Sequence, residues 1–438
     1  MGLSTILSID PGSSYTKVAI RRGWNQDSDL IRDLSLEEER VYCFPSIVAK
    51  VETRGRVEWL TGEAAFGRPR GGDENIYENW KKHVFPVDRD RADGEYLEVA
   101  LNYFRGLKTL LGKLDERVIN APCRIAIPSL PHAAEQAAEL VAIARTAGFK
   151  MLSTRPWIFE PEANAVGVFT RARNASRVFD GSPTRYPIYL DMFEKQGPLA
   201  FAREKSLQKA GSEPGRDAFR LLVVDVGAFT TDVGCVEYRM PELDIEQFQR
   251  PKVNQLSWAL GIEEVDKAIC RRLARKKRTH IESMPASDWE GLKRRLYHAL
   301  ETELVTEEGS LIIGGHADYA IVEEEMTEFA KRVVEAVAEF CDGSEVRPFQ
   351  ALITGGGLAI PSLRAQLAKG IRAKFDVEAA NLLDPDEPRK ALLPKPLWDS
   401  EWNPDETEAR ARVQLNHELA RGGSALGACS VFNDLPAN

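Results

Sequence analysis

The chain has 438 residues and a formal net charge of −9; 43% of its residues are hydrophobic and 29% are charged. This composition is typical of a globular protein, and the acidic balance argues against a nucleic-acid-binding surface. No stretch approaches the roughly 20 consecutive apolar residues that cross a bilayer, so we expect no membrane-spanning helix. A chain of this length can bury a sizeable core and form several subdomains.

The six cysteines are scattered along the chain, and no two of them form a C-x-x-C pair. Cys123 and Cys235 lie inside apolar strand patterns, which favours buried free thiols over zinc ligands or disulfides. The first residues pass directly into a strand pattern and lack the shape of a signal peptide. Together these features predict a cytoplasmic protein.

The first predicted element is a β-hairpin at residues 5–20, TILSIDPGSSYTKVAI. An apolar run leads into Asp10 and Gly12, hydroxyl residues follow, and apolar residues resume at Val18. An apolar run bounded by turn residues predicts a buried strand, and its resumption predicts the hairpin partner.

Strand and helix patterns then alternate as far as residue 165. We predict strands at residues 41–51, 56–60, 124–128 and 157–159, and helices at 62–65, 95–114, 133–147 and from 160 onward. Such alternation predicts an α/β fold. Residues 70–94, rich in Gly, Asp and Arg, predict a surface excursion that contains Lys81 and Lys82. A lysine in this excursion is either a solvated charge or a phosphate contact.

A second hairpin is predicted at residues 221–236, LLVVDVGAFTTDVGCV. Backbone N–H groups and hydroxyls in its turn, with Asp225 and Asp232 at its base, suit a metal-bound phosphate. A polar turn in an ordinary sheet is the alternative. The motif repeats the first hairpin at an offset of 215 residues (225 − 10 = 215), which suggests two related domains. The matched pairs are Asp10 and Asp225, Gly12 and Gly227, Thr16 and Thr231, and Val18 and Val233.

Further elements are predicted after the second hairpin. They are helices that continue to about residue 278 and over 288–304, 323–340, 362–375 and 422–432, a small strand pair near 312–315 and an apolar strand at 350–353. Gly355, Gly356 and Gly357 stand between this strand and the helix that follows it. They allow a ligand to approach the backbone near the positive end of the helix, or they form a flexible turn.

Five segments resemble, in order, the nucleotide-binding fold that actin, the sugar kinases and the heat-shock protein 70 chaperones share. They are IDPGSSYTKVAI, FEPEANAVG, VVDVGAFTTDV, ITGGGLAIPSLR and GGSALGACSVF. The stretches RIAIPSLPHAAEQAAELVAIARTAGF and GIEEVDKAICRRL are most similar to the chaperone (DnaK-type) ATPase domain. The resemblance implies a duplicated actin-like ATPase fold, with two ribonuclease-H-like lobes around a nucleotide cleft.

The implied domains follow the same order. Residues 1–168 would form the first lobe, 169–220 an insertion, and 221–350 the second lobe with a small subdomain at about 262–320. Residues 351–432 would hold the adenosine segment and a return helix to the first lobe, interrupted by a proline-rich excursion at 384–408.

The resemblance also implies ATP or ADP and magnesium as cofactors, with roles for particular residues. Asp10 and Asp225 would hold the water shell of Mg²⁺, and Asp232 would help to organise cations there. Glu160 and Asp225 would orient the attacking water, and Lys81 or Lys82 would match the catalytic lysine. The residues that would cradle phosphates are Gly12, Ser13, Ser14, Tyr15, Gly227 and Thr230, and those that would face the adenosine are Gly355, Gly356 and Gly357.

Three features depart from the family. Ala228 and Phe229 stand where the family has consecutive glycines, which affects the expected hydrolysis rate. Residues 298–305 do not reproduce the family's charged adenine clamp, so the expectation of adenine binding rests on the fold. No segment before Asn438 resembles the chaperones' peptide-binding β-domain, so a client would have to bind another surface.

The leading expectation is therefore a chaperone-like, magnesium-dependent ATPase whose lobes open and close with nucleotide state. Its partners would be a nucleotide and a protein client or cochaperone. An actin-like or plasmid-segregation-type filament ATPase, which would self-associate, remains an alternative. A second alternative is a nucleotide-binding scaffold that does not hydrolyse ATP.

Overall fold

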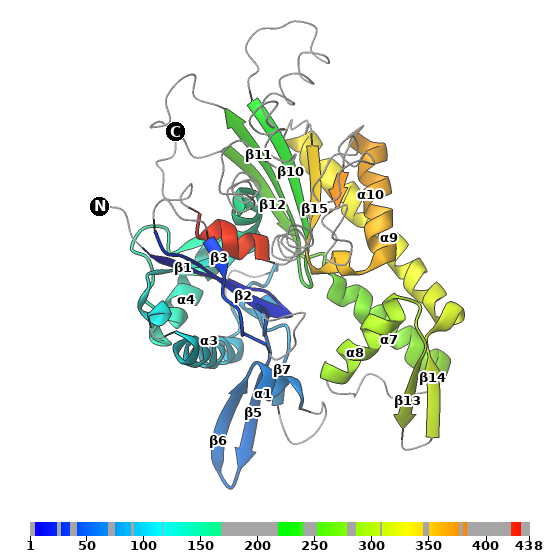
Figure 1. The fold of residues 1–438 in the computed structure, drawn as a ribbon, viewed down its shortest axis with the longest axis horizontal. Helices are drawn as coiled ribbons and strands as arrows, with labels where there is room; N and C mark the ends of the chain where they lie inside the picture. Colours follow the sequence, from blue (N-terminus) through cyan, green and yellow to red (C-terminus); the bar gives the residue numbers. More distant parts are fainter. Residues whose placement is uncertain are drawn as a thin grey trace, which may run out of the picture.

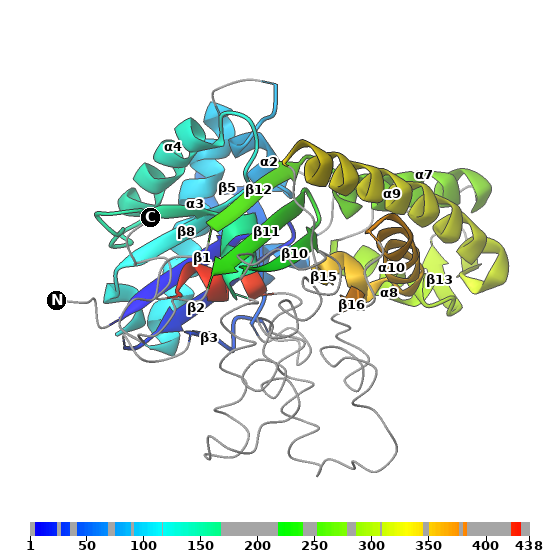
Figure 2. The same cartoon turned by 90° about the horizontal axis from the view of Figure 1, so that it is seen from above.

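The computed structural model describes residues 5–23, 28–35, 42–68, 75–88, 92–115, 117–167, 218–239, 252–277, 286–306, 309–344, 350–375, 380–382 and 422–430. Strands and helices alternate along these ranges, so the predicted α/β class is confirmed. They form two mixed sheets with helices packed against them (Figures 1 and 2). The excursion predicted at 384–408 and nearly all of the insertion predicted at 169–220 lie outside the described residues.

We call residues 5–167 together with 422–430 the first lobe. The strand order in its main sheet is β3-β2-β1-β8-β9, with β4 also paired to β2. These strands are β1 (Ile6–Pro11), β2 (Tyr15–Arg21), β3 (Ser28–Leu30), β4 (Phe44–Pro45), β8 (Cys123–Ile127) and β9 (Trp157–Phe159). β1 runs antiparallel to β2 and parallel to β8, which is parallel to β9.

The first lobe also has a smaller, antiparallel sheet, ordered β6-β5-β7, which projects at the bottom of Figure 1. Its strands are β5 (Val48–Thr53), β6 (Arg56–Thr61) and β7 (Asn75–Tyr77). Two one-turn helices, α1 (Glu63–Phe66) and α2 (Lys81–Val84), follow β6 and β7 respectively. α2 leads back from this small sheet toward the main body of the lobe (Figure 2).

Side-chain alternation along β1 decides what lies on each face of the first sheet. Leu7 and Ile9 pack in one core with α3 (Gly94–Leu114) and α4 (Ala133–Thr146). Ser8 points to the opposite face, where its hydroxyl donates to the carbonyl of Ala425 in the helix of residues 422–428. Asp10 has the same parity as Ser8, so it lies on the face turned away from α3 and α4.

We call residues 218–382 the second lobe. The strand order in its sheet is β12-β11-β10-β15-β16, with β10 antiparallel to β11 and parallel to β15. The strands are β10 (Ala218–Val226), β11 (Thr231–Arg239), β12 (Lys252–Trp258), β15 (Gln350–Thr354) and β16 (Ala380–Leu382). This order and these directions are equivalent to those of the first sheet.

The helices of the second lobe share one core with its sheet. Leu222, Val224 and Val226 of β10 pack there, so the intervening Asp225 faces the other way. The helices are α7 (Ile262–Lys277), α8 (Ala286–Tyr297), α9 (Gly315–Gly343) and α10 (Pro361–Phe375). A small strand pair, β13 (Thr302–Thr306) and β14 (Gly309–Ile313), lies beyond α7 and α8 at the lower right of Figure 1.

The two hairpins have the same register. Asp10 pairs with Lys17 in the first, and Asp225 pairs with Asp232 in the second. Both members of the second pair lie 215 residues after those of the first (10 + 215 = 225; 17 + 215 = 232). The repeat found in the sequence therefore corresponds to a repeat of backbone pairing.

Several predicted boundaries were wrong. The helix predicted over 288–304 ends at Tyr297, because residues 302–306 pair with β14 instead. The long helix predicted at 323–340 already begins at Gly315. The supposed surface excursion at 70–94 contains β7 and α2, and Lys81 within it is only 3% exposed.

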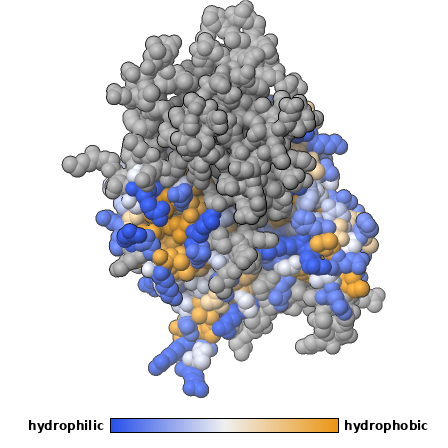
Figure 3. Space-filling view, viewed as in Figure 1, coloured by the Kyte–Doolittle hydropathy of each residue, from blue (hydrophilic) through white to orange (hydrophobic). Residues whose placement is uncertain are grey.

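Hydrophilic side chains cover most of the described surface in Figure 3; the largest group of apolar side chains lies over the first sheet, and smaller groups lie at the bottom and at the lower right. Within the described ranges, no helix combines the length and the apolar character needed to cross a membrane.

The helices of residues 160–167 and 422–428 cross at very short range because glycines line their contact. A Cβ atom added to Gly427 would lie 1.6 Å from the carbonyl oxygen of Ala163, and one added to Gly167 would lie 2.2 Å from that of Gly423. Neither carbonyl can move without disturbing its own helix, so only glycine fits at these two positions.

We therefore expect Gly427→Ala to lower the free energy of unfolding by about 3 kcal/mol, the upper end of typical overpacking costs. Urea denaturation would measure the change. The control is Gly291→Ala at an exposed position of α8, where an added Cβ meets no atom within 4 Å. That variant should gain about 1 kcal/mol from helix propensity. Equal stability of the two variants would contradict the close helix crossing.

Candidate functional site

The acidic ends of both hairpins open into one cleft between the lobes, with a volume of about 420 Å³. β1 and β10 bring their carboxylates to it from opposite sides, because Asp10 and Asp225 both point away from the helical core of their own lobe. Apart from Lys82, the candidate site residues that the sequence singled out line this cleft. They are Asp10, Gly12, Ser13, Ser14, Tyr15, Lys81, Glu160, Asp225, Gly227, Thr230, Asp232, Gly355, Gly356 and Gly357.

Of the two candidate lysines, Lys81 is the one that lines the cleft. Its side chain is 3% exposed, and its ammonium group is hydrogen-bonded and ion-paired to Glu160. Lys82 points elsewhere, with its ammonium nitrogen 3.2 Å from Oε1 of Glu263 in α7. That contact joins the two lobes outside the set of cleft-lining residues.

Lys81 and Glu160 form a buried pair at this end of the cleft. Burial alone would lower the pKa of Lys81, but the carboxylates of Glu160 and Asp10 raise it overall, so the lysine stays cationic. Burial raises the pKa of Glu160, and Lys81 offsets part of that rise. A cation fixed in this place can neutralise the charge of an anionic ligand.

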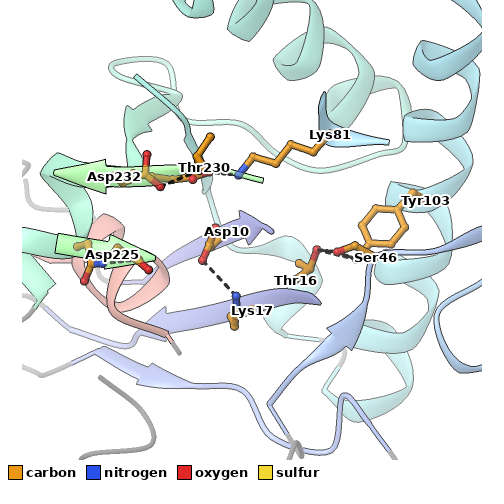
Figure 4. A network of polar contacts seen from close by, with 11 residues as sticks. Asp10, Thr16, Lys17, Ser46, Lys81, Tyr103, Asp225, Thr230 and Asp232 are labelled. Atoms are coloured by element: carbon orange, nitrogen blue, oxygen red, sulfur yellow. Dashed lines mark hydrogen bonds and ion pairs between the residues drawn. The ribbon is translucent and has the colours of Figure 1, made fainter. Parts of the chain in front are cut away.

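Asp225 and Asp232 are held by donors from three different segments. The hydroxyl of Thr230 donates to Asp232 Oδ2 at 2.9 Å, and the hydroxyl of Ser257 donates to Oδ1 of the same carboxylate. The amide of Asn164 donates to Asp225 Oδ2. In Figure 4, Lys81 extends toward Thr230, and Asp10 lies between Lys81 and Lys17, whose ammonium is 3.9 Å from Asp10 Oδ2.

Lys17 is a cleft residue that sequence reasoning missed. It occupies, in the first hairpin, the position that Asp232 occupies in the second, so the repeat itself pointed to it. Burial raises the pKa of Asp225 to about 7, and Lys17 is the positive charge that opposes this rise most strongly. Lys17 and Lys81 thus supply two cations to the acidic end of the cleft.

Two glycines keep this end of the cleft open. Gly355 has φ +104°, and a Cβ added there would lie 2.3 Å from Asp225 Oδ1. A Cβ added to Gly12 would lie 2.4 Å from the carbonyl oxygen of Tyr15. Gly355 therefore lets the backbone approach Asp225, and Gly12 allows the tight turn of the first hairpin.

Within the described ranges, no three acidic, histidine or cysteine side chains lie together as a ready-made metal cage. Magnesium does not require one, because it keeps several waters and takes one or two protein carboxylates plus phosphate oxygens. Asp10, Asp225 and Asp232 are carboxylates of the right chemistry on the wall of one cleft. The donor set therefore fits a hydrated magnesium ion that arrives with a phosphate ligand.

The opposite end of the cleft carries a second polar group from α7 and α8. Lys293 lies 2.9 Å from Asp266 Oδ2 and 2.7 Å from Glu290 Oε2, and the hydroxyl of Tyr297 donates to Asp266. Glu290, Lys293 and Tyr297 follow one another at intervals of three and four residues, which places them on one helix face. Charged groups were expected at residues 298–305 in the sequence, whereas the polar group lies just before that segment.

The raised pKa of Asp225 gives a pH dependence that can be measured without ligand. A carboxyl with a folded pKa of about 7 and an unfolded value near 3.8 binds protons more tightly when folded, so it stabilises the fold at low pH. This contribution falls as pH rises from about 4 through about 7. We expect Asp225→Asn to gain a few degrees in melting temperature relative to wild type between pH 5.5 and pH 8.5. An unchanged difference would contradict the raised pKa.

Phe229 lies on the cleft wall between the two lobes. It belongs to the turn of the second hairpin, yet its ring packs against the core of the first lobe. The neighbouring Ala228 and Thr230 line the cleft as well. A ring in this turn takes up volume that glycines would leave free.

Comparison with known proteins assigns no family to the chain. No protein-family model matches the chain, and no curated protein matches it in sequence. The chemistry of the cleft therefore follows from its own residues: an acidic, lysine-bearing end built from two hairpins and a polar end built from α7 and α8.

Proposed function

We propose that this protein binds ATP with magnesium in the cleft between its lobes and hydrolyses ATP to ADP and phosphate. The fold would be a duplicated actin-like ATPase fold with two ribonuclease-H-like lobes. The observation that carries the proposal is the pair of hairpins with equal register. They bring two glycine turns, Asp10 and Asp225 to one cleft that also holds Lys81 and Glu160.

At the acidic end, the hydroxyl of Ser13 lines the cleft and would donate to phosphate oxygens, whereas the Thr230 hydroxyl already donates to Asp232. Lys81 and Lys17 would balance phosphate charge, and Asp10 and Asp225 would hold magnesium through its waters. Magnesium supplies charge neutralisation of the phosphates when it is bound. Glu160 and Asp225 can accept hydrogen bonds from a water molecule and orient it toward the terminal phosphorus.

At the polar end, α7 and α8 offer donors and acceptors on one side of the cleft, and Gly356 and Gly357 offer bare backbone on the other. A nucleoside needs a flat space of this kind with polar groups at its edges. The distribution of charge supports the orientation of the ligand, because Lys17 and Lys81 lie at the hairpin end, whereas Lys293 at the other end is paired with both Asp266 and Glu290. The polar end built from α7 and α8, which lacks the three aspartates of the hairpin end, would suit the base and the ribose.

Polar contacts between side chains and backbone groups join the two lobes. Because such contacts can break and form again, they support opening and closing of the lobes around the ligand. Lys82 reaches Glu263, and the backbone N–H of Ser129 donates to the Ser257 hydroxyl at 2.7 Å. Ser257 in turn donates to Asp232, so one of these contacts ends on a cleft carboxylate. A change of charge at Asp232 would therefore alter this contact between the lobes. A chaperone-like ATPase requires such a link between the cleft and the arrangement of its lobes.

Phe229 favours a second candidate, a nucleotide-binding scaffold with little hydrolysis. Phe229 lines the cleft next to Thr230 and takes up volume that a glycine would leave free. Phosphate release from ATP by purified protein, with and without magnesium, separates the two functions. Magnesium-dependent release supports the ATPase. Binding of ATP without release supports the scaffold, and absence of both would overturn the two together.

A further inference from the structure

One side chain behind the cleft wall is absent from the roles assigned so far. Asn164 is 1% exposed and does not line the cleft, yet its amide donates to Oδ2 of Asp225 in the other lobe. It comes from the helix of residues 160–167, which also begins with Glu160. Residues four apart share a helix face, so one helix carries both Glu160 and Asn164 toward the second lobe.

The orientation of the Asn164 amide is determined by its neighbour. Its NH₂ group donates to Oδ2 of Asp225, as an amide does to a carboxylate acceptor. The amide oxygen Oδ1 then points away; it is buried and has no hydrogen-bond partner. Rotation of the amide would turn this oxygen toward Asp225 and set two acceptors against each other.

The side chain has little freedom to move. A Cβ atom added to Gly423 in the crossing helix would lie 2.1 Å from Asn164 Oδ1, so the backbone of that helix packs directly against the amide. A buried donor that is fixed on both sides is suited to hold its acceptor in one position.

The two carboxylate oxygens of Asp225 therefore have different neighbours. Oδ2 is occupied by Asn164, whereas Oδ1 lies beside Gly355 on the cleft wall, 2.3 Å from where a Cβ of that residue would be. Because Asn164 occupies Oδ2, Oδ1 is the oxygen left for a ligand in the cleft. Free rotation of the carboxylate would otherwise spread its charge over several orientations.

We infer that Asn164 is a positioning residue for Asp225: it fixes the carboxylate so that Oδ1 faces the magnesium and the attacking water. This inference rests on the proposed function of the cleft. The helix of residues 160–167 would then contribute two residues to the site: Glu160 acts in the cleft directly, and Asn164 acts through Asp225. Partners of this kind usually alter metal affinity or activity by about 10- to 100-fold when they are removed.

The test compares Asn164→Ala and Asn164→Asp with wild type. Asn164→Ala removes the donor, and Asn164→Asp replaces the amide by a carboxyl of the same size that repels an ionised Asp225, so a loss seen in both variants is not a packing defect. The matched control is Glu162→Gln, on the same helix and 5% exposed, which loses an ion pair with Arg155 at 3.2 Å and does not line the cleft. Calorimetric titration of ATP, in magnesium and in EDTA, is measured beside turnover.

Both Asn164 variants should bind ATP in EDTA like wild type, need about tenfold more magnesium for tight binding, and turn over ATP at least about tenfold more slowly. Glu162→Gln should match wild type in all three measurements. Wild-type magnesium dependence in both Asn164 variants, or equal losses in Glu162→Gln, would overturn the inference alone. No ATP binding by wild type would overturn the proposed function, and the inference with it.

Discussion

Asp225→Asn is expected to lower ATP turnover by at least about 100-fold while ATP still binds, because it removes the carboxylate but keeps the shape of the side chain. Asp225 Oδ1 borders the glycine turn at Gly355, where a terminal phosphate and its attacking water would meet. An amide cannot attract magnesium waters as a carboxylate does. It also cannot take up a proton from the attacking water.

The control for this variant is Asp115→Asn, which changes an aspartate outside the cleft that pairs with the exposed Arg117. Phosphate release under saturating magnesium and ATP gives turnover, and calorimetry gives ATP affinity. Equal turnover by wild type and Asp225→Asn would contradict the assignment of Asp225. Loss of turnover in Asp115→Asn as well would point to general damage instead.

Lys81→Ala is the second change with a large expected effect, again about 100-fold in turnover, because it deletes a buried cation from the acidic end of the cleft. Glu160 would then be left buried without its partner, and its already raised pKa would rise further. The carboxyl would become protonated and lose its ability to orient water. The neighbouring Lys82→Ala provides the matched comparison.

Lys82→Ala removes a half-exposed lysine that pairs with Glu263 at 3.2 Å, so turnover should stay within about threefold of wild type, as expected for a surface ion pair. Both variants lose the same charge from adjacent positions of one short helix. A comparison of phosphate release by the two variants therefore measures the effect of where the ammonium group lies, not of losing one positive charge. Similar losses in the two variants would contradict the special place of Lys81.

The hairpins were the most predictable part of the molecule. Apolar runs on each side of Asp10 and Asp225 predicted strand, turn and strand, and the constant offset of 215 residues predicted two related hairpins, which the structure shows with the same register. Short glycine and aspartate motifs are local, so their structure follows from a few residues. The cleft-lining glycines were found for the same reason.

The small sheet and its helices were less predictable. β7 and α2 have only three and four residues, and their surroundings are rich in Gly, Asp and Arg, so residues 70–94 carry no clear periodicity. Lys81 is buried because Glu160, 79 residues later, compensates its charge. A contact between such distant residues leaves no trace in the local sequence.

The supporting polar residues were missed because each depends on the other lobe or on a neighbouring strand. Asn164 is an ordinary helix residue until Asp225 of the second lobe stands opposite it. Lys17 alternates with apolar neighbours like any strand lysine until its pairing with Asp10 is known. The polar face of α8 could be recognised from the spacing of Glu290 and Lys293, but its role depends on where α8 lies.

Calorimetric titration of wild-type protein with ATP, once in magnesium and once in EDTA, tests the central claim most directly. The account predicts saturable binding of one ATP per chain, tighter in magnesium, because Asp10 and Asp225 offer carboxylates to the metal and Lys81 offers charge to the phosphates. Absence of binding under both conditions, or equal binding with and without magnesium, would contradict it.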